Sequence, residues 1–352
     1  MSARAFHIGG RLVGPGHRPL VVAEMSGNHN QSLERALQIV DAAAEARADA
    51  VKIQTYTADT MTLDLAEGDF FISDDASLWR GKSLYDLYGE AHTPWEWHEP
   101  IFARCREHGI IGFSSPFDDS AVEFLEQLSA PCYKIASFEN TDIPLIRKAA
   151  STGKPLIVST GMANQMEIAE AVDAARGAGC RDLILLKCTS TYPATPENSH
   201  LRTIPDLAAR YGCLSGLSDH TMGIGAAVAS VAMGAALIEK HFTLSRADGG
   251  VDAAFSLEPA ELRTLVVETE RAWEAMGEVR YGPAPGEERS LAYRRSLYIV
   301  RDMQPGEKLT RENLRAIRPG SGLPPRHYDE LVGRSVSKAV KRGTPVSWDL
   351  LE

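Results

Sequence analysis

Eight short apolar segments alternate with amphipathic segments along the first 280 residues, and this alternation constrains the fold more than any other feature. Each apolar segment is nearly continuous in hydrophobic character, as expected for a strand that is buried on both faces. The predicted strands are 20–24, 50–54, 109–115, 132–137, 155–160, 183–188, 213–218 and 236–241. A strand followed by a helix, repeated eight times, predicts an α/β fold of the (β/α)8 TIM-barrel type.

The two ends of the chain predict additions to this barrel. Residues 6–19 predict a hairpin that could close the bottom of the barrel. Residues 281–290 are rich in glycine, proline and charge, which is typical of a linker between a domain at 1–280 and a second one at 291–352. The second domain reads as a small β-rich module near the lower size limit for an independent core. We therefore expect it to lean on the barrel or on a partner subunit.

Charge and cysteine usage narrow the class of protein. The formal net charge is −10 and the sequence pI about 5.5, so no general basic surface for nucleic acid is expected, and an anionic substrate would need a local positive pocket. The five cysteines are widely spaced and form no CxxC pair, which favours reduced thiols and a cytoplasmic protein. The sequence contains neither an apolar signal core at its start nor a stretch that would span a bilayer comfortably, so no membrane partner is expected.

Polar side chains follow the apolar segments repeatedly, at the face where TIM barrels carry their catalytic groups. Taken singly, a serine after a strand is usually a helix cap, and a lysine in a strand usually extends to the surface. Eight strands that all end in such groups are harder to explain, because buried charges must be paired or used. The candidates are Glu24, Lys52, Gln54, Ser115, Lys134, Ser137, Ser159, Ser190, Tyr192, Ser218, His220 and His241.

These residue types indicate two kinds of chemistry. Lysines together with several hydroxyl groups are suited to binding phosphate. His220 and His241 follow consecutive predicted strands, so they either share a divalent metal or are satisfied polar residues at strand ends. Glu24 could act as an acid or base or bind a polyol, and Asp252 stands in a glycine-rich loop, where it is either a site carboxylate or a turn residue.

The connection at 56–93 is too long for an ordinary strand-to-helix loop and carries several aromatic residues. A segment that covers the substrate is the favoured interpretation. The alternative is an insertion that contacts a neighbouring subunit.

Several motifs together resemble the sialic acid synthase family over the whole chain. They are "VAEMSGNHN", "AVKIQTY", "FSSPFD", "YKIASFE", "VSTGM", "CTSTYP", "GLSDHT" and "EKHFTL". The end of the chain, with "IRPGSGL", resembles the antifreeze-like (SAF) domain of that family. Enzymes of this family condense phosphoenolpyruvate with an amino sugar.

Two loop segments, "EAHTPWEWH" and "GGVDAAFSLEP", resemble the pseudaminic acid branch of the family. That resemblance implies condensation of phosphoenolpyruvate with 2,4-diacetamido-2,4,6-trideoxy-L-altrose and water, with release of phosphate by C–O cleavage. Synthesis of N-acetylneuraminic or legionaminic acid is the alternative within the family. Outside it, a Schiff-base aldolase using Lys52 or Lys134 and a carbohydrate-binding protein without catalysis are the rivals.

The resemblance also implies roles for individual residues. His220 and His241 match ligands of a divalent metal, with Mn favoured and Co or Mg as alternatives. The implied phosphoenolpyruvate contacts are Lys52, Ser115, Lys134, Ser137, Ser159, Ser190 and Ser218. The implied catalytic groups are Glu24, Lys52, Lys134 and Asp252, and the implied sugar contacts are Gln54, Tyr192, Asp252 and Arg318. Arg318 matches an arginine that reaches the partner subunit's sugar site, so a domain-swapped homodimer is expected.

Overall fold

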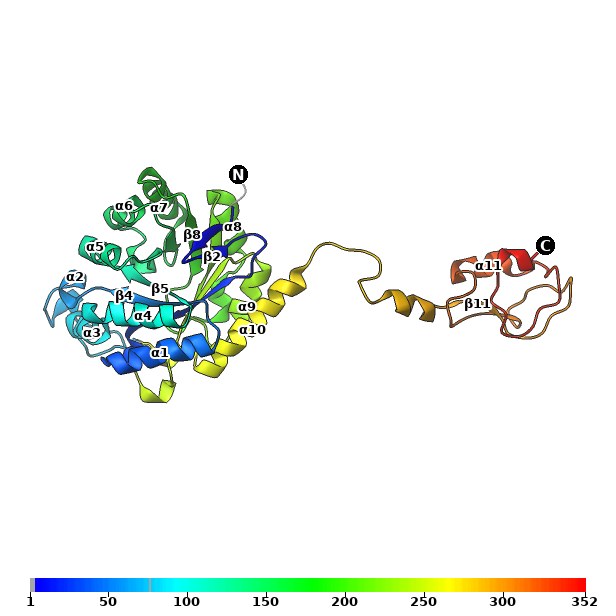
Figure 1. Ribbon diagram of the computed structural model, residues 1–352, viewed down its shortest axis with the longest axis horizontal. Helices are drawn as coiled ribbons and strands as arrows, with labels where there is room; N and C mark the ends of the chain where they lie inside the picture. The colour runs from blue at the N-terminus through cyan, green and yellow to red at the C-terminus, as the bar shows by residue number, and fades with distance from the viewer. Residues whose placement is uncertain (1–3, 76) are drawn as a thin grey trace. The chain divides into compact units, whose positions relative to one another are not determined.

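The computed structural model describes residues 4–75 and 77–352, and its contacts divide the chain into two compact units, Met1–Gly277 and Glu278–Glu352 (Figure 1). Each unit has its own hydrophobic core. The predicted linker limits at 281 and 290 stay a prediction.

The first unit is a closed barrel of eight parallel strands, which confirms the predicted fold class. Strand β10 pairs with β3, and this pairing closes the barrel. The strands are β3 Leu20–Glu24, β4 Ala50–Thr55, β5 Ile111–Pro116, β6 Tyr133–Ile135, β7 Leu156–Ser159, β8 Leu183–Cys188, β9 Leu214–Asp219 and β10 Leu237–His241. Strand β6 is shorter than the predicted 132–137, because a 3-10 turn at Ser137–Glu139 begins soon after it.

Eight helices that follow the barrel strands lie around the outside of the barrel (Figure 1). Capping side chains define where several of them begin: Ser32 before the first, Asp118, Asp142 and Asn164 before later ones. Buried aliphatic side chains on their inner faces pack against the outward-facing side chains of the strands. The helices are α1 Leu33–Glu45, α4 His98–Glu107, α5 Asp119–Gln127, α6 Ile143–Ser151, α7 Gln165–Gly177, α8 Thr203–Tyr211, α9 Gly225–Ala232 and α10 Pro259–Met276.

A hairpin closes the bottom of the barrel, as the sequence predicts. It consists of β1 Phe6–Ile8 and β2 Arg11–Val13, joined through Gly9 and Gly10. Their φ values of 53° and 86° suit a two-residue hairpin turn that L side chains adopt poorly. Apolar side chains of both strands join the cluster inside the barrel, so the catalytic face must be the other one.

Residues 56–93, here called the covering segment, form short elements instead of an open loop. They are α2 Ala58–Met61, a 3-10 turn at Gly68–Phe70 and α3 Leu84–Ala91. Phe71 and Ser83 form a β-bridge at the base of the central loop, and the Ser83 side chain caps α3. The segment is therefore an organised substructure on one side of the barrel mouth.

The second unit is built on an antiparallel pair, β11 Ser296–Ile299 and β12 Leu314–Ile317, with the short helix α11 Tyr328–Leu331. Ten buried apolar residues form its separate core. No helix within 4–75 and 77–352 is long and apolar enough to cross a membrane.

Candidate active site

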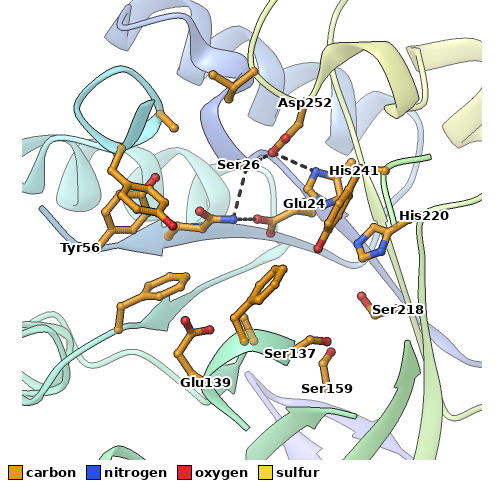
Figure 2. A pocket seen from close by; sticks show the side chains of 18 of the residues that line it. Glu24, Ser26, Tyr56, Ser137, Glu139, Ser159, Ser218, His220, His241 and Asp252 are labelled. Atoms are coloured by element: carbon orange, nitrogen blue, oxygen red, sulfur yellow. Dashed lines mark hydrogen bonds and ion pairs between the residues drawn. The ribbon is translucent and has the colours of Figure 1, made fainter. Parts of the chain in front are cut away.

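A pocket of about 280 Å³ opens at the carboxyl ends of the barrel strands and is lined on one side by the covering segment (Figure 2). Parallel pairing brings strand ends together: Glu24 lies beside both Lys52 and His241 in register. Most of the predicted site residues line this pocket. They are Glu24, Lys52, Gln54, Lys134, Ser137, Ser159, Tyr192, Ser218, His220, His241 and Asp252.

Three predicted residues lie elsewhere. Ser115 is buried beneath the pocket, where its hydroxyl accepts a hydrogen bond from Lys52 Nζ at 3.2 Å. Ser190 is not one of the lining residues, but its hydroxyl lies near that of Ser137: a Cβ added at Gly161 would collide with both Ser190 Oγ and Ser137 Oγ. Arg318 is an exposed residue of the second unit, directly after β12.

Two lysines and two carboxylates form a buried ionic network at the floor of the pocket. Lys52 Nζ lies 2.9 Å from Glu24 Oε2 and 3.7 Å from Glu239 Oε1. Lys134 Nζ lies 3.4 Å from the same Glu239 oxygen. All four side chains are at most 5% exposed, so their charges act on one another in a weakly screening environment.

The two lysines of this network differ in how well their charge is compensated. Burial lowers the pKa of Lys134, and the opposing attraction of Glu239 is too weak to return the pKa to its ordinary value. Burial would also lower the pKa of Lys52, but Glu239 and Glu24 outweigh that effect and raise it. Burial raises the pKa of Glu24 despite the opposing attraction of Lys52. Lys134 is thus the cation that would gain most from an incoming anion.

Glu239 is a site residue that the candidate set did not include. Its carboxylate receives a hydrogen bond from Ser218 Oγ at 3.2 Å besides contacting both lysines. The sequence pattern could have identified Glu239, because it stands two residues before the candidate His241, and residues two apart on a strand point to the same face.

The two histidines approach each other at the ends of β9 and β10. Their ring centroids are 5.2 Å apart. His220 Nδ1 lies 2.9 Å from Thr189 O, so Nδ1–H donates to that carbonyl and Nε2 is the nitrogen that could face a metal. Burial, reinforced by His220 and Lys52, keeps the pKa of His241 well below its usual range, and the neutral ring is the form that binds metals.

Whether His220 and His241 can hold a metal depends on the hydrogen-bond partners and the further ligands around them. His241 Nδ1 is buried and finds no hydrogen-bond partner in the described part of the chain, although Asp252 Oδ2 is 3.6 Å away. Such an orphaned nitrogen is costly unless a ligand satisfies it. Within 4–75 and 77–352, no group of three or more potential ligands is arranged as a complete metal site. The histidines therefore fit a metal whose remaining ligands come from water or substrate.

A second buried ion pair lies behind the histidines. Lys240 Nζ is 2.8 Å from Asp219 Oδ2 and donates to Thr221 O at 2.7 Å. Asp219 directly precedes His220 and Lys240 directly precedes His241. Because successive side chains of a strand point to opposite faces, Asp219 and Lys240 point away from the barrel interior. The pair joins β9 and β10 at the residues that immediately precede the two imidazoles.

A chain of polar groups leads from the network to the loop after β10. Gln54 Nε2 donates to Glu24 Oε1 at 2.8 Å and to Ser26 Oγ at 3.3 Å, and Ser26 Oγ in turn donates to Asp252 (Figure 2). Ser26 is buried with φ at 46°, a strained conformation for serine and one that often occurs at functional sites. No pattern in the sequence pointed to Ser26.

Glu139 is the second acidic residue that the candidate set did not include. It ends the 3-10 turn after β6, and its Oε2 is buried without a hydrogen-bond partner among the described residues. Burial raises the pKa of Glu139 to about 7, although Lys134 opposes the shift. A carboxyl group with that pKa can both donate and accept a proton near neutral pH.

Comparisons with known proteins agree with this geometry. Residues 39–281 match the model of the NeuB family, and residues 294–352 match that of the SAF domain. The pseudaminic acid synthase of Helicobacter pylori is 42% identical over 95% of this chain and 98% of its own length. The N,N'-diacetyllegionaminic acid synthase of Legionella pneumophila is 34% identical over 94% of both chains. Among solved structures, the N-acetylneuraminic acid synthetase of Leptospira borgpetersenii in complex with citrate is 30% identical, with a TM-score of 0.73 over 82% of this chain and 95% of its own.

Proposed function

The chain belongs to the NeuB family, and we propose that it condenses phosphoenolpyruvate with 2,4-diacetamido-2,4,6-trideoxy-L-altrose and water to give pseudaminic acid and phosphate. The observation that carries this proposal is the pair of buried lysines, Lys52 and Lys134, on the floor of a partly covered pocket. Two cations in a weakly screening pocket suit a small substrate with two anionic groups. The similarity to pseudaminic acid synthases supports the choice of sugar.

Phosphoenolpyruvate would bind at the lysines, with its phosphate and carboxylate oxygens accepting from nearby hydroxyl groups. The lysines already face Glu24 and Glu239, so an added anion would bring like charges together unless a carboxyl group takes up a proton. Glu24 is suited to do so, because burial raises its pKa. The proposed hydroxyl donors that line the pocket are Ser137, Ser159 and Ser218, and the proposal also includes Ser115 and Ser190, which lie outside the lining.

The sugar would react as its open-chain aldehyde, held by Gln54, Tyr192 and Asp252. The methylene carbon of phosphoenolpyruvate forms the new C–C bond to the aldehyde carbon, while the C=O π bond breaks and the aldehyde oxygen takes up a proton to become a hydroxyl group. Water then adds to the cationic enol carbon, and the hemiketal phosphate loses phosphate by cleavage of the C–O bond. Glu139, with a pKa of about 7, is suited to accept the proton that the water gives up.

His220 and His241 would hold a divalent metal, and we propose Mn, with Co or Mg as alternatives. When bound, such an ion supplies a Lewis acid for the aldehyde oxygen. The neutral state of His241 and the hydrogen bond that orients His220 prepare both rings for this role.

A phosphate-release assay tests the proposed function. The purified enzyme would be given phosphoenolpyruvate and Mn with one of three sugars: the trideoxy altrose, its legionaminic counterpart or N-acetylmannosamine. Turnover that is fastest with the altrose derivative supports the proposal. Fastest turnover with either other sugar would instead identify a legionaminate or N-acetylneuraminate synthase, which the 34%-identical relative keeps as the second candidate.

We also propose a domain-swapped homodimer in which Arg318 reaches the partner's sugar site. Residues 278–352 contain 14 lysines and arginines against 10 acidic residues, whereas residues 1–277 contain 23 against 37. The basic second unit and the acidic first unit are therefore electrostatically complementary, which would favour association of a second unit with a barrel. A cytoplasmic location is part of this proposal, because all five cysteines are free thiols.

A further inference from the structure

The two ends of the pocket differ in chemistry. His220 and His241 lie at one end, whereas Tyr56 lies at the other (Figure 2). The covering segment contributes largely apolar side chains to the lining of the pocket, here called the apolar wall, which begins at Tyr56 and extends to Trp79 beside Tyr192. It consists of Tyr56, Met61, Ile72, Trp79, Leu84 and Leu87.

The apolar wall is held in place by specific contacts. Trp79 Nε1 donates to Val251 O at 2.9 Å, which fastens the tip of the covering segment to the loop that carries Asp252. The ring of Tyr56 packs edge-on against Tyr88 and Phe117, with centroids 5.9 Å and 5.1 Å apart. Around Ile72, two backbone hydrogen bonds tie the turn together, from Ile72 N to Lys82 O and from Gly81 N to Ile72 O. The side chains are thus presented to the pocket by a braced structure.

The apolar wall has little capacity for hydrogen bonding. The indole N–H of Trp79 is already used, and the three aliphatic side chains and the thioether of Met61 offer no hydrogen-bond donor. A hydroxyl group of a ligand placed against them would lose its water without gaining a partner. The phenol of Tyr56 is the exception, and burial together with Asp252 raises its pKa, so that it stays a donor. An acetamido group suits this surface, because its methyl can pack against the apolar side chains and its carbonyl oxygen can accept a hydrogen bond from the phenol of Tyr56.

We infer that the apolar wall recognises methyl groups of the sugar, namely the acetamido methyls and a terminal methyl carbon, and that Ile72 and Leu84 are specificity-determining residues. This inference rests on the proposed function and extends it from the reacting groups to the choice of sugar. Adding a hydroxyl to a ligand in an apolar site reduces kcat/KM by up to about a hundredfold, and removing a methyl by about ten- to two-hundredfold. The wild-type enzyme should therefore discriminate against both changes.

The test compares three sugars in phosphate-release assays: the trideoxy diacetamido altrose, its 6-hydroxylated counterpart and its diformamido counterpart. The variants are Ile72→Thr and Leu84→Thr. Leu63→Thr is the matched control, because Leu63 belongs to the covering segment, is 59% exposed and is not one of the lining side chains. The measured quantity is the ratio of kcat/KM for the parent sugar to kcat/KM for an analogue. For at least one analogue, we expect this ratio to be about fivefold or more lower in a variant of Ile72 or Leu84 than in the wild type. KM for phosphoenolpyruvate and the behaviour of Leu63→Thr should stay unchanged.

The outcomes separate the inference from the function on which it rests. If the wild type does not turn over the parent sugar, the proposed function is refuted and the inference falls with it. If the wild type is active but the wall variants lose activity equally with all three sugars, the apolar wall is only structural and the inference alone is overturned. A wild type that uses the three sugars equally well would also overturn it.

Discussion

Lys134 and Lys240 are both buried, and replacing each with methionine should show which charge is needed for the reaction and which is needed for the stability of the fold. Lys240 is 1% exposed, and its ammonium group is the partner of Asp219 at 2.8 Å. Removing one member of such a buried pair leaves the other charge uncompensated, at a cost of about 3–5 kcal/mol. We therefore expect Lys240→Met to lower the free energy of unfolding of the barrel by that amount.

Lys134→Met should behave differently although Lys134 is equally buried. Glu239 keeps Lys52 at 3.7 Å and the hydroxyl of Ser218 at 3.2 Å when Lys134 is removed. Burial lowers the pKa of Lys134, so its charge is itself unfavourable in the unliganded pocket. Replacing it with an apolar group of similar volume should change the free energy of unfolding by less than about 1 kcal/mol. The loss of a preorganised cation should reduce kcat/KM for phosphoenolpyruvate by about 10²–10³, or about 2.7–4 kcal/mol.

Two measurements check this pair of variants. Urea titration followed by tryptophan fluorescence gives the change in stability, and phosphate release at varied phosphoenolpyruvate concentration gives kcat/KM. The reasoning is refuted if Lys134→Met destabilises the barrel as strongly as Lys240→Met does, or if it retains wild-type kcat/KM. Trapping a covalent adduct on Lys134 with borohydride and substrate would favour the Schiff-base mechanism instead.

Three further predictions concern the metal, pH and assembly. His241→Ala should abolish both turnover and Mn binding measured by electron paramagnetic resonance, and chelation of the wild type should do the same to turnover; a fully active chelated enzyme would contradict the metal proposal. Burial lowers the pKa of His98 to about 4 in the folded protein, so the unfolded chain binds the proton first and stability is lost as pH falls. Between pH 7 and pH 5 this histidine should account for about 2 kcal/mol of unfolding free energy, and a wild type and His98→Gln with equal pH dependence would disprove that. Mixing Arg318→Ala with His241→Ala subunits should restore part of the activity, because a swapped heterodimer contains one intact site; no recovery despite measured subunit exchange would rule out the swap.

Some features of the site followed from the chain alone. Near-continuous apolar segments separated by helical periodicity leave few folds besides a barrel of parallel strands. Parallel strands place their carboxyl ends on one face, so Lys52, His220 and His241 could be assigned to that face before any contact was known. Alternation of side chains along β10 would have added Glu239 by the same logic.

Other features depended on tertiary structure. Lys134 meets Glu239, 105 residues away, because closure of the barrel brings β6 and β10 to opposite walls of one narrow interior. Ser26 reaches Asp252 through a strained backbone, and Trp79, which lines the pocket, donates to Val251 O in the loop that carries Asp252. Local sequence patterns report which face of an element a residue occupies, since that depends on the period of the backbone. They do not report which residue it meets across the pocket, because that depends on barrel closure and on the packing of loops from distant parts of the chain.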